Sequence, residues 1–156
     1  VYKRQAEIIL PDGLAVGTYM AVNACGEIYD QDKILAGALA DDDRTIISSH
    51  RLMLEGYERN MGGNTSIGCI ITNADLTKTE CRMVSTMAHD GLARSIRPVH
   101  TSMDGDTLFT MASGEVKTTI DTVGYLAEEA VRLAVLDAAA SAEGMGGRPA
   151  YRDIIK

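Results

Sequence analysis

The chain has 156 residues, 46% of them hydrophobic and 24% charged, which is typical of one globular domain. This composition excludes a disordered tail, a collagen-like repeat and a disulfide scaffold. The formal net charge of −7 is the opposite of the basic footprint that phosphate binding needs, so we expect no nucleic acid partner. No apolar run approaches the roughly 20 residues of a membrane-spanning helix, so we expect no membrane partner.

Three cysteines and three histidines are the candidate soft metal ligands of the sequence. Cys25, Cys69 and Cys81 form no Cys-x-x-Cys pair, and the histidines are scattered, so the spacing does not support a zinc site. We therefore expect neither a metal nor a cofactor. An odd number of cysteines without paired spacing is typical of reduced thiols, which favours a cytoplasmic location.

Apolar runs and turn residues predict a β-rich first part of the chain. The tripeptide Pro11-Asp12-Gly13 predicts a turn between two strands. In chain order, the predicted elements are strands at 6–10 and 14–25, a continuation of the ladder at 27–30, a surface loop at 31–44, and a helix from Ser48 or Ser49 to about Arg59.

The second part of the chain alternates strands with longer helices, because apolar residues recur there at helical spacing behind candidate capping residues. The predicted elements are a buried strand at 65–73, a helix at 77–95 capped by Asp75 or Thr77 and ended by Pro98, a strand at 107–112 with a turn at Ser113-Gly114, and a helix from Thr118 or Thr119 that ends before Gly144. This order predicts a mixed α/β domain of sandwich type, with a doubly wound sheet as the competing topology.

The segment Gly62-Gly63-Asn64-Thr65 leads from a glycine turn directly into a buried strand that starts with Thr. This is the pattern that a self-cleaving precursor needs, because glycine permits the strained backbone from which the Thr65 hydroxyl attacks the preceding carbonyl. Cleavage would leave Thr65 with a free α-amine, whose pKa of about 8 suits a general base. The alternative interpretation is a simple turn before a strand.

Asp104-Gly105-Asp106 is the second candidate for chemistry. Paired carboxylates can orient a nucleophile or hold a proton, whereas Asp-Gly is also a common hairpin turn. Calcium binding would need further oxygen ligands at regular spacing, and these are missing. Ser102, His100 and Asp106 could be assembled into a Ser-His-Asp triad, but no Gly-x-Ser-x-Gly elbow supports it.

Several motifs together resemble the DmpA-type aminopeptidase family, which includes β-peptidyl aminopeptidases and nylon-oligomer hydrolases. The resemblance covers about residues 11–142. Its motifs are Val16-Gly17, Val22-Asn23-Ala24, the strand from Gly63 to Ala74 (GNTSIGCIITNA), Leu76-Thr77-Lys78, the run from Met87 to Thr101 (MAHDGLARSIRPVHT) and Asp104 to Phe109 (DGDTLF).

The resemblance implies an α/β fold, an α/β/β/α four-layer sandwich similar to the N-terminal-nucleophile hydrolases. It implies self-cleavage between Asn64 and Thr65, which makes 6–64 the end of one subunit and 65–156 the other. It assigns Thr65 as the nucleophile, Asn23 as an oxyanion donor, and Asp104 and Asp106 as the acidic pair near it. The two subunits are expected to stay together in a homo-oligomer of cleaved heterodimers.

The implied function is an aminopeptidase or amidase that removes N-terminal amino acids from small peptides, amides or esters through an acyl-enzyme on Thr65. The alternatives are an acyl transferase resembling the ornithine acetyltransferases, and a non-catalytic relative of the fold. A cleavage assay separates the aminopeptidase and the acyl transferase from the non-catalytic relative, because the non-catalytic relative would keep the fold and remain one chain.

The first five residues, Val1 to Gln5, resemble the translation of a sequencing adaptor, and a chain trimmed for expression would start as abruptly. We set these residues aside and expect residues 6–156 to be the C-terminal part of one self-processing domain. On this interpretation an upstream segment with further active-site residues is a missing partner, and the isolated chain is expected to be inactive and poorly stable.

Overall fold

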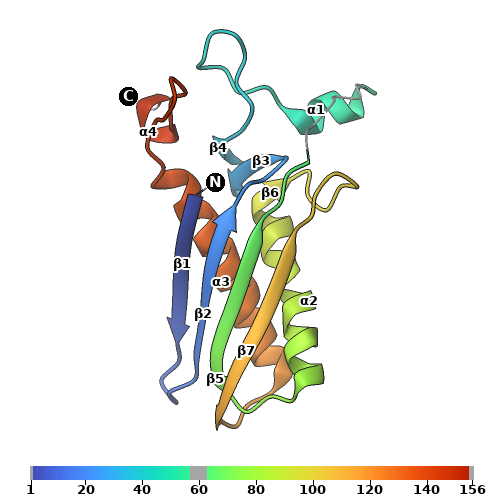
Figure 1. The fold of residues 1–156 in the computed structure, drawn as a ribbon, viewed down its shortest axis with the longest axis vertical. Coiled ribbons are helices and arrows are strands. Elements are labelled where there is room, and N and C mark those ends of the chain that lie inside the picture. Colours follow the sequence, from blue (N-terminus) through green and yellow to red (C-terminus); the bar gives the residue numbers. More distant parts are fainter. Residues whose placement is uncertain (1, 57–62, 155–156) are drawn as a thin grey trace.

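The computed structural model describes residues 2–56 and 63–154 and builds them around one four-stranded sheet (Figure 1). The strand order is β1-β2-β5-β7, in which the first three strands are antiparallel neighbours and β5 and β7 are parallel. The strands are β1 (Tyr2–Ile9), β2 (Ala15–Val22), β5 (Ile67–Ala74) and β7 (Thr107–Val116).

The hairpin of β1 and β2 forms at the predicted turn. Gly13 adopts a φ of 89°, which an L side chain rarely tolerates, and the Asp12 carboxylate accepts a hydrogen bond from the Leu14 N–H at 3.0 Å. Residues 2–5, which we set aside, continue this ladder, since Tyr2 pairs with Val22. Whatever their origin, their backbone belongs to the sheet.

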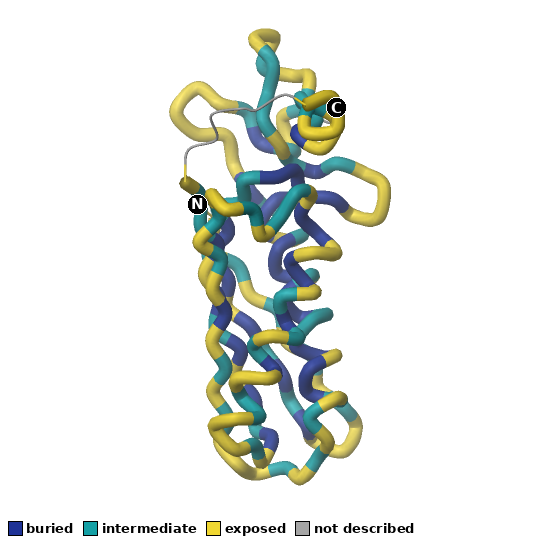
Figure 2. The backbone as a smooth tube through the Cα atoms, turned by 90° about the vertical axis from the view of Figure 1, so that its right-hand side faces the viewer, coloured by how far each residue is buried: buried dark blue, intermediate teal, exposed yellow. Residues whose placement is uncertain are grey.

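The helices α2 (Lys78–Ser95) and α3 (Ile120–Ala140) begin where capping residues predicted them. The Thr77 hydroxyl accepts from the Glu80 N–H while the Glu80 carboxylate accepts from the Thr77 N–H, which is a complete capping box. At the start of α3, the Thr119 hydroxyl accepts from the Thr122 N–H. Both helices cover one face of the sheet, and the buried segments lie between helices and sheet (Figure 2).

A second, three-stranded sheet of order β4-β3-β6 lies beyond one end of the large sheet (Figure 1). It contains β3 (Glu27–Asp30), β4 (Lys33–Ala36) and β6 (Ile96–Arg97), and two short helices accompany it, α1 (Ser49–Leu54) and α4 (Tyr151–Ile154). Ser48 caps α1 as predicted, because its hydroxyl accepts from the Arg51 N–H.

Several predicted boundaries are wrong, among them the end of the strand predicted at 14–25, which stops at Val22. The surface loop 31–44 contains β4, because Lys33–Ala36 finds its ladder partner in β3 rather than in a local pattern. The helix α1 ends at Leu54 instead of about Arg59, and residues 57–59 lie outside the described residues. The predicted turn at Ser113-Gly114 lies inside β7, which passes it with Gly114 at a φ of 82° and pairs on to Val116.

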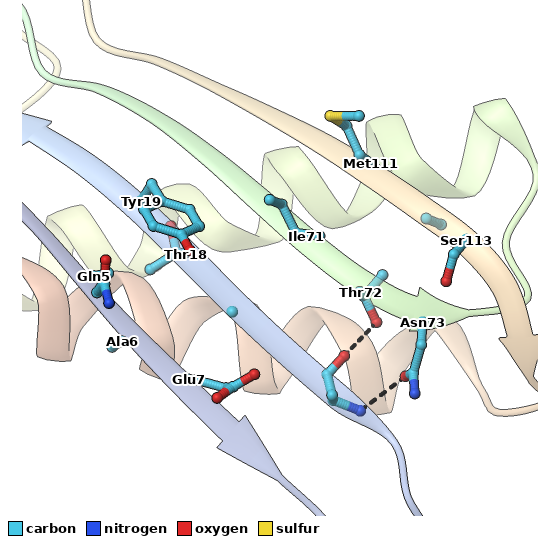
Figure 3. A pocket seen from close by; sticks show the side chains of 13 residues that line it. Gln5, Ala6, Glu7, Thr18, Tyr19, Ile71, Thr72, Asn73, Met111 and Ser113 are labelled. Atoms are coloured by element: carbon cyan, nitrogen blue, oxygen red, sulfur yellow. Dashed lines mark hydrogen bonds between the residues drawn. The ribbon is translucent and has the colours of Figure 1, made fainter.

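The other face of the large sheet carries apolar side chains that no described element covers. Along β2 and β5, side chains alternate between the helix-covered core and this face, as the period of a strand requires. Tyr19, Ile71 and Met111 surround a hollow of about 650 Å³ on it (Figure 3). We call it the open sheet face. Among the described helices, none is long and apolar enough to cross a membrane.

Candidate active site

The β5–α2–β7 unit brings two distant segments together. Because β5 and β7 are parallel, the residues just before each strand lie at the same end of the sheet. Asn64 forms a parallel bridge with Asp104, and the Thr107 N–H donates to the carbonyl oxygen of Ser66 at 3.0 Å. The two predicted motifs, the Asn64–Thr65 bond and the acidic pair, are therefore neighbours.

The carbonyl oxygen of Asn64 accepts two hydrogen bonds. The Thr65 hydroxyl donates to it at 2.7 Å, and the Gly105 N–H donates to it at 2.9 Å. Gly105 also lies so close that a Cβ at this position would be 2.7 Å from the Thr65 hydroxyl oxygen. The absence of a side chain at Gly105 thus leaves room for the hydroxyl beside the carbonyl, while the N–H polarises that carbonyl.

Both predicted carboxylates lie in this cluster. Asp104 accepts from the backbone N–H and the hydroxyl of Thr101, at 3.1 and 2.7 Å, through its Oδ2. Asp106 accepts from the Ser66 N–H at 2.7 Å through its Oδ1. The two acidic residues flank Gly105 in the chain, and each carboxylate is held by a hydrogen bond, Asp104 by Thr101 of its own loop and Asp106 by Ser66, the residue after Thr65.

Asn23 and Cys25 reach the cluster from the end of β2. The Asn23 N–H donates to the Ser66 hydroxyl at 3.2 Å, and the Asn64 side-chain amide donates to the Ala24 carbonyl at 2.8 Å. Burial, and then the charges of the acidic pair, raise the pKa of the Cys25 thiol. Asn23, Cys25 and Asn64 line a cavity of about 400 Å³ with otherwise mostly apolar walls.

The Ser102–His100–Asp106 arrangement does not form in the part of the chain that the structure describes. The His100 ring instead contacts the His89 ring, with 3.0 Å between Nε2 and Nδ1. Ser102 is exposed, and Asp106 is bound to Ser66. Within residues 2–56 and 63–154, no three His, Cys, Asp or Glu side chains are grouped to hold a metal ion.

Sequence reasoning missed Gly105 and Ser66. Ser66 is fully buried and connects Asn23 to Asp106, since its hydroxyl accepts from one and its N–H donates to the other. A strand–helix–strand order was a usable signal, because a crossover helix joins parallel strands and brings their starts together. No sequence pattern predicted that the Gly105 N–H donates to the Asn64 carbonyl oxygen.

Solved structures with the same architecture are known. The L-aminopeptidase D-Ala-esterase/amidase of Ochrobactrum anthropi, described as a variant of the Ntn hydrolase fold, aligns with a TM-score of 0.61 at 16% identity over 95% of this chain and 42% of that one. A β-aminopeptidase of Burkholderia sp. gives a TM-score of 0.61 at 16% identity over 99% of this chain and 47% of that one. The chain has this α/β fold, as predicted.

Sequence relatives give the family. An uncharacterised aminopeptidase of Mycobacterium leprae is 34% identical over 167 residues, which cover 94% of this chain and 46% of that protein. A 6-aminohexanoate-oligomer endohydrolase of Paenarthrobacter ureafaciens is 41% identical over 54 residues, 35% of this chain and 15% of that one. The chain spans about half the length of the mycobacterial relatives that it matches. Residues 5–152 match the model of peptidase family S58, and the chain therefore belongs to that family.

Proposed function

We propose that this chain carries the nucleophile of a self-cleaving aminopeptidase that acts on small peptides, amino-acid amides or esters. One observation supports this above the others: the Thr65 hydroxyl is hydrogen-bonded to the carbonyl of the bond that it would break, and a backbone N–H donates to the same oxygen. The names of the relatives support the class of substrate, since they are aminopeptidases and a hydrolase of amide oligomers.

Self-cleavage starts with the attack of the Thr65 hydroxyl oxygen on the carbonyl carbon of Asn64. The Gly105 N–H stabilises the charge that develops on the carbonyl oxygen. The C–N bond then breaks, the nitrogen takes up the hydroxyl proton and becomes the amine of Thr65, and an ester joins Asn64 to the Thr65 oxygen. Water hydrolyses this ester and leaves a carboxylate on Asn64.

The same hydroxyl then acts on substrates. The new α-amine of Thr65 takes the hydroxyl proton, because an α-amino group with a pKa of about 8 still has about one tenth of its molecules in the free-base form at pH 7. The oxygen attacks the substrate carbonyl, the amine product leaves, and water hydrolyses the acyl-enzyme. Asn23 is the proposed side-chain donor to the oxyanion, and Asp104 and Asp106 are proposed to orient the α-ammonium. The raised pKa of Cys25 keeps that thiol protonated, so it does not compete as a nucleophile.

Intact-mass analysis of the complete protein, in which this chain is joined to the expected upstream segment, tests self-cleavage. We expect two fragments, one of which starts at Thr65, and we expect Thr65→Ala to give one intact chain. Thr65→Ser keeps a hydroxyl and should cleave. A wild-type chain that remains intact, both alone and when joined to its upstream segment, would contradict the proposal and favour a non-catalytic relative.

A substrate assay separates peptidase from transferase. The cleaved protein is incubated with amino-acid amides in one reaction and with N-acetylornithine and an acyl acceptor in another. Release of ammonia from the amides supports the aminopeptidase. Acyl transfer without amide hydrolysis would support the ornithine-acetyltransferase-like alternative instead.

A further inference from the structure

Two histidines form a pair between helix α2 and the loop that carries the acidic residues. His89 lies on α2, and His100 lies on the loop before Asp104. The distance from His89 Nδ1 to His100 Nε2 is 3.0 Å, and the ring centroids are 4.9 Å apart with the planes tilted by 58°. His100 has a φ of 55°, a left-handed conformation that costs free energy in a residue with a side chain.

Hydrogen bonds and short backbone links lead from this pair to the scissile carbonyl. Thr101 follows His100 directly and donates to the Asp104 carboxylate through its N–H and its hydroxyl. Asp104 bridges to Asn64, and the next residue, Gly105, donates its N–H to the Asn64 carbonyl. The His89–His100 contact therefore anchors the loop at one end, and the Asn64 carbonyl lies at the other end.

We propose that His89 and His100 are positioning residues for self-cleavage, whose hydrogen bond holds the loop of residues 98–106 so that the Gly105 N–H points at the Asn64 carbonyl. The inference rests on the proposed function, and the pair itself touches neither the nucleophile nor the scissile bond. The strained backbone of His100 is consistent with a side chain that is held by its partner, because strain persists only where surrounding contacts fix it.

The pair gives the loop a dependence on pH with a defined sign. One ring N–H and one ring lone pair make the bond, so the neutral pair and the singly protonated pair both form it, whereas two protonated rings have no acceptor. Burial and the neighbouring His100 lower the pKa of His89, while the charges of Asp106 and Asp90 raise it. Arg82 lines a surface hollow together with His89 and His100, and its positive charge opposes protonation of the second ring. The bond is therefore present at neutral pH and is lost only when both rings are protonated, which requires acidification through the lowered pKa of His89.

Hydrogen exchange of the Gly105 amide tests the positioning without any need for cleavage. The measurement uses the chain with Thr65→Ala, which stays intact. We expect His100→Ala to speed exchange of this amide by about threefold to tenfold, which corresponds to the net free energy that one hydrogen bond contributes. The double variant with His89→Asn and His100→Gln replaces the rings by amides that reach similarly, and it should restore protection. Equal protection in all three chains would overturn the proposal.

The rate of self-cleavage against pH is the second readout. We expect wild-type cleavage to fall as the pH drops through the lowered pKa of His89, His100→Ala to be slower throughout, and the double amide variant to lose this decline because amides do not titrate. His50→Ala, which removes an exposed histidine of α1, is the matched control and should keep the wild-type profile. A decline that survives in the double amide variant would refute the role of the pair. Absence of cleavage in every chain would instead count against the proposed function, while the exchange result still decides the positioning.

Discussion

Gly105→Ala is the substitution that tests the geometry of the site most directly. The variant keeps the backbone N–H that donates to the Asn64 carbonyl and adds one methyl group. That Cβ would lie 2.7 Å from the Thr65 hydroxyl oxygen, but 3.6 and 3.7 Å from Thr65 Cγ2 and Cβ, which are ordinary contacts. The clash is therefore confined to the hydroxyl, and rotation about χ1 of Thr65 relieves it.

The size of the effect follows from this rotation. Off-rotamer strain in the folded state costs about 0.5–1.5 kcal/mol, which lowers the melting temperature of a domain of this size by a few degrees. The hydroxyl, however, leaves its place beside the carbonyl, and a misplacement of about 1 Å can slow a reaction by about 10²-fold. We expect cleavage to slow by about 100-fold while the fold remains intact.

The assay follows the intact mass of the complete protein over time, together with its thermal unfolding. Gly17→Ala is the matched control, because it adds a methyl group in β2, away from the scissile bond, and its Cβ would meet its nearest neighbour, the Ala6 carbonyl oxygen, at an ordinary 3.6 Å. Cleavage of Gly105→Ala at the rate of the Gly17→Ala control, with the same melting temperature, would show that the hydroxyl does not attack from this position.

Three further substitutions have expected outcomes. Thr77→Ala removes the hydroxyl that caps α2 and should lower the free energy of unfolding in urea by about 1 kcal/mol, whereas Thr77→Ser should lower it less. The hydrogen bonds to Thr77 lower the pKa of Glu80. The stability that this cap contributes is therefore present at pH values above the usual pKa of a glutamate, and it is lost as the pH falls through the lowered pKa. Asp106→Asn keeps an acceptor for the Ser66 N–H but removes its charge, and we expect a loss of about 1 kcal/mol by thermal unfolding; an unchanged melting temperature would contradict the bond at 2.7 Å. Met111→Thr replaces an apolar side chain that is 62% exposed on the open sheet face, so it should reduce self-association and binding of a hydrophobic dye without lowering stability.

The helices could be predicted because their signals are local. Thr77 and Glu80 form a capping box within one turn, and the apolar residues behind them repeat at helical spacing. The strand Lys33–Ala36 could not be predicted from its pattern, because its pairing with β3 is irregular between Ile28 and Tyr29 and the two residues before it are polar. The turn predicted at Ser113-Gly114 failed for the opposite reason, because the local signal was present but Gly114 adopts its left-handed conformation inside strand β7.

The candidate site divides in the same way. Thr65 and Asp104 are visible as motifs, and the family resemblance connects them, but the sequence does not say which strand β5 pairs with. Their contact depends on the parallel register that sets Ile67 opposite Thr107. The role of Gly105 depends on the direction of one N–H bond and on a few tenths of an ångström at a missing Cβ, which only three-dimensional coordinates provide.

The three anchors of Asn64 have a consequence for maturation. Its N–H donates to Met103, its side chain donates to Ala24, and its carbonyl accepts from Gly105. None of these bonds is broken by scission of the peptide that follows, so the severed end would stay in the lining of the cavity beside Thr65. Self-cleavage alone would thus leave Asn64, the new C-terminus, in the site, and the first turnover would require Asn64 to move away from Thr65.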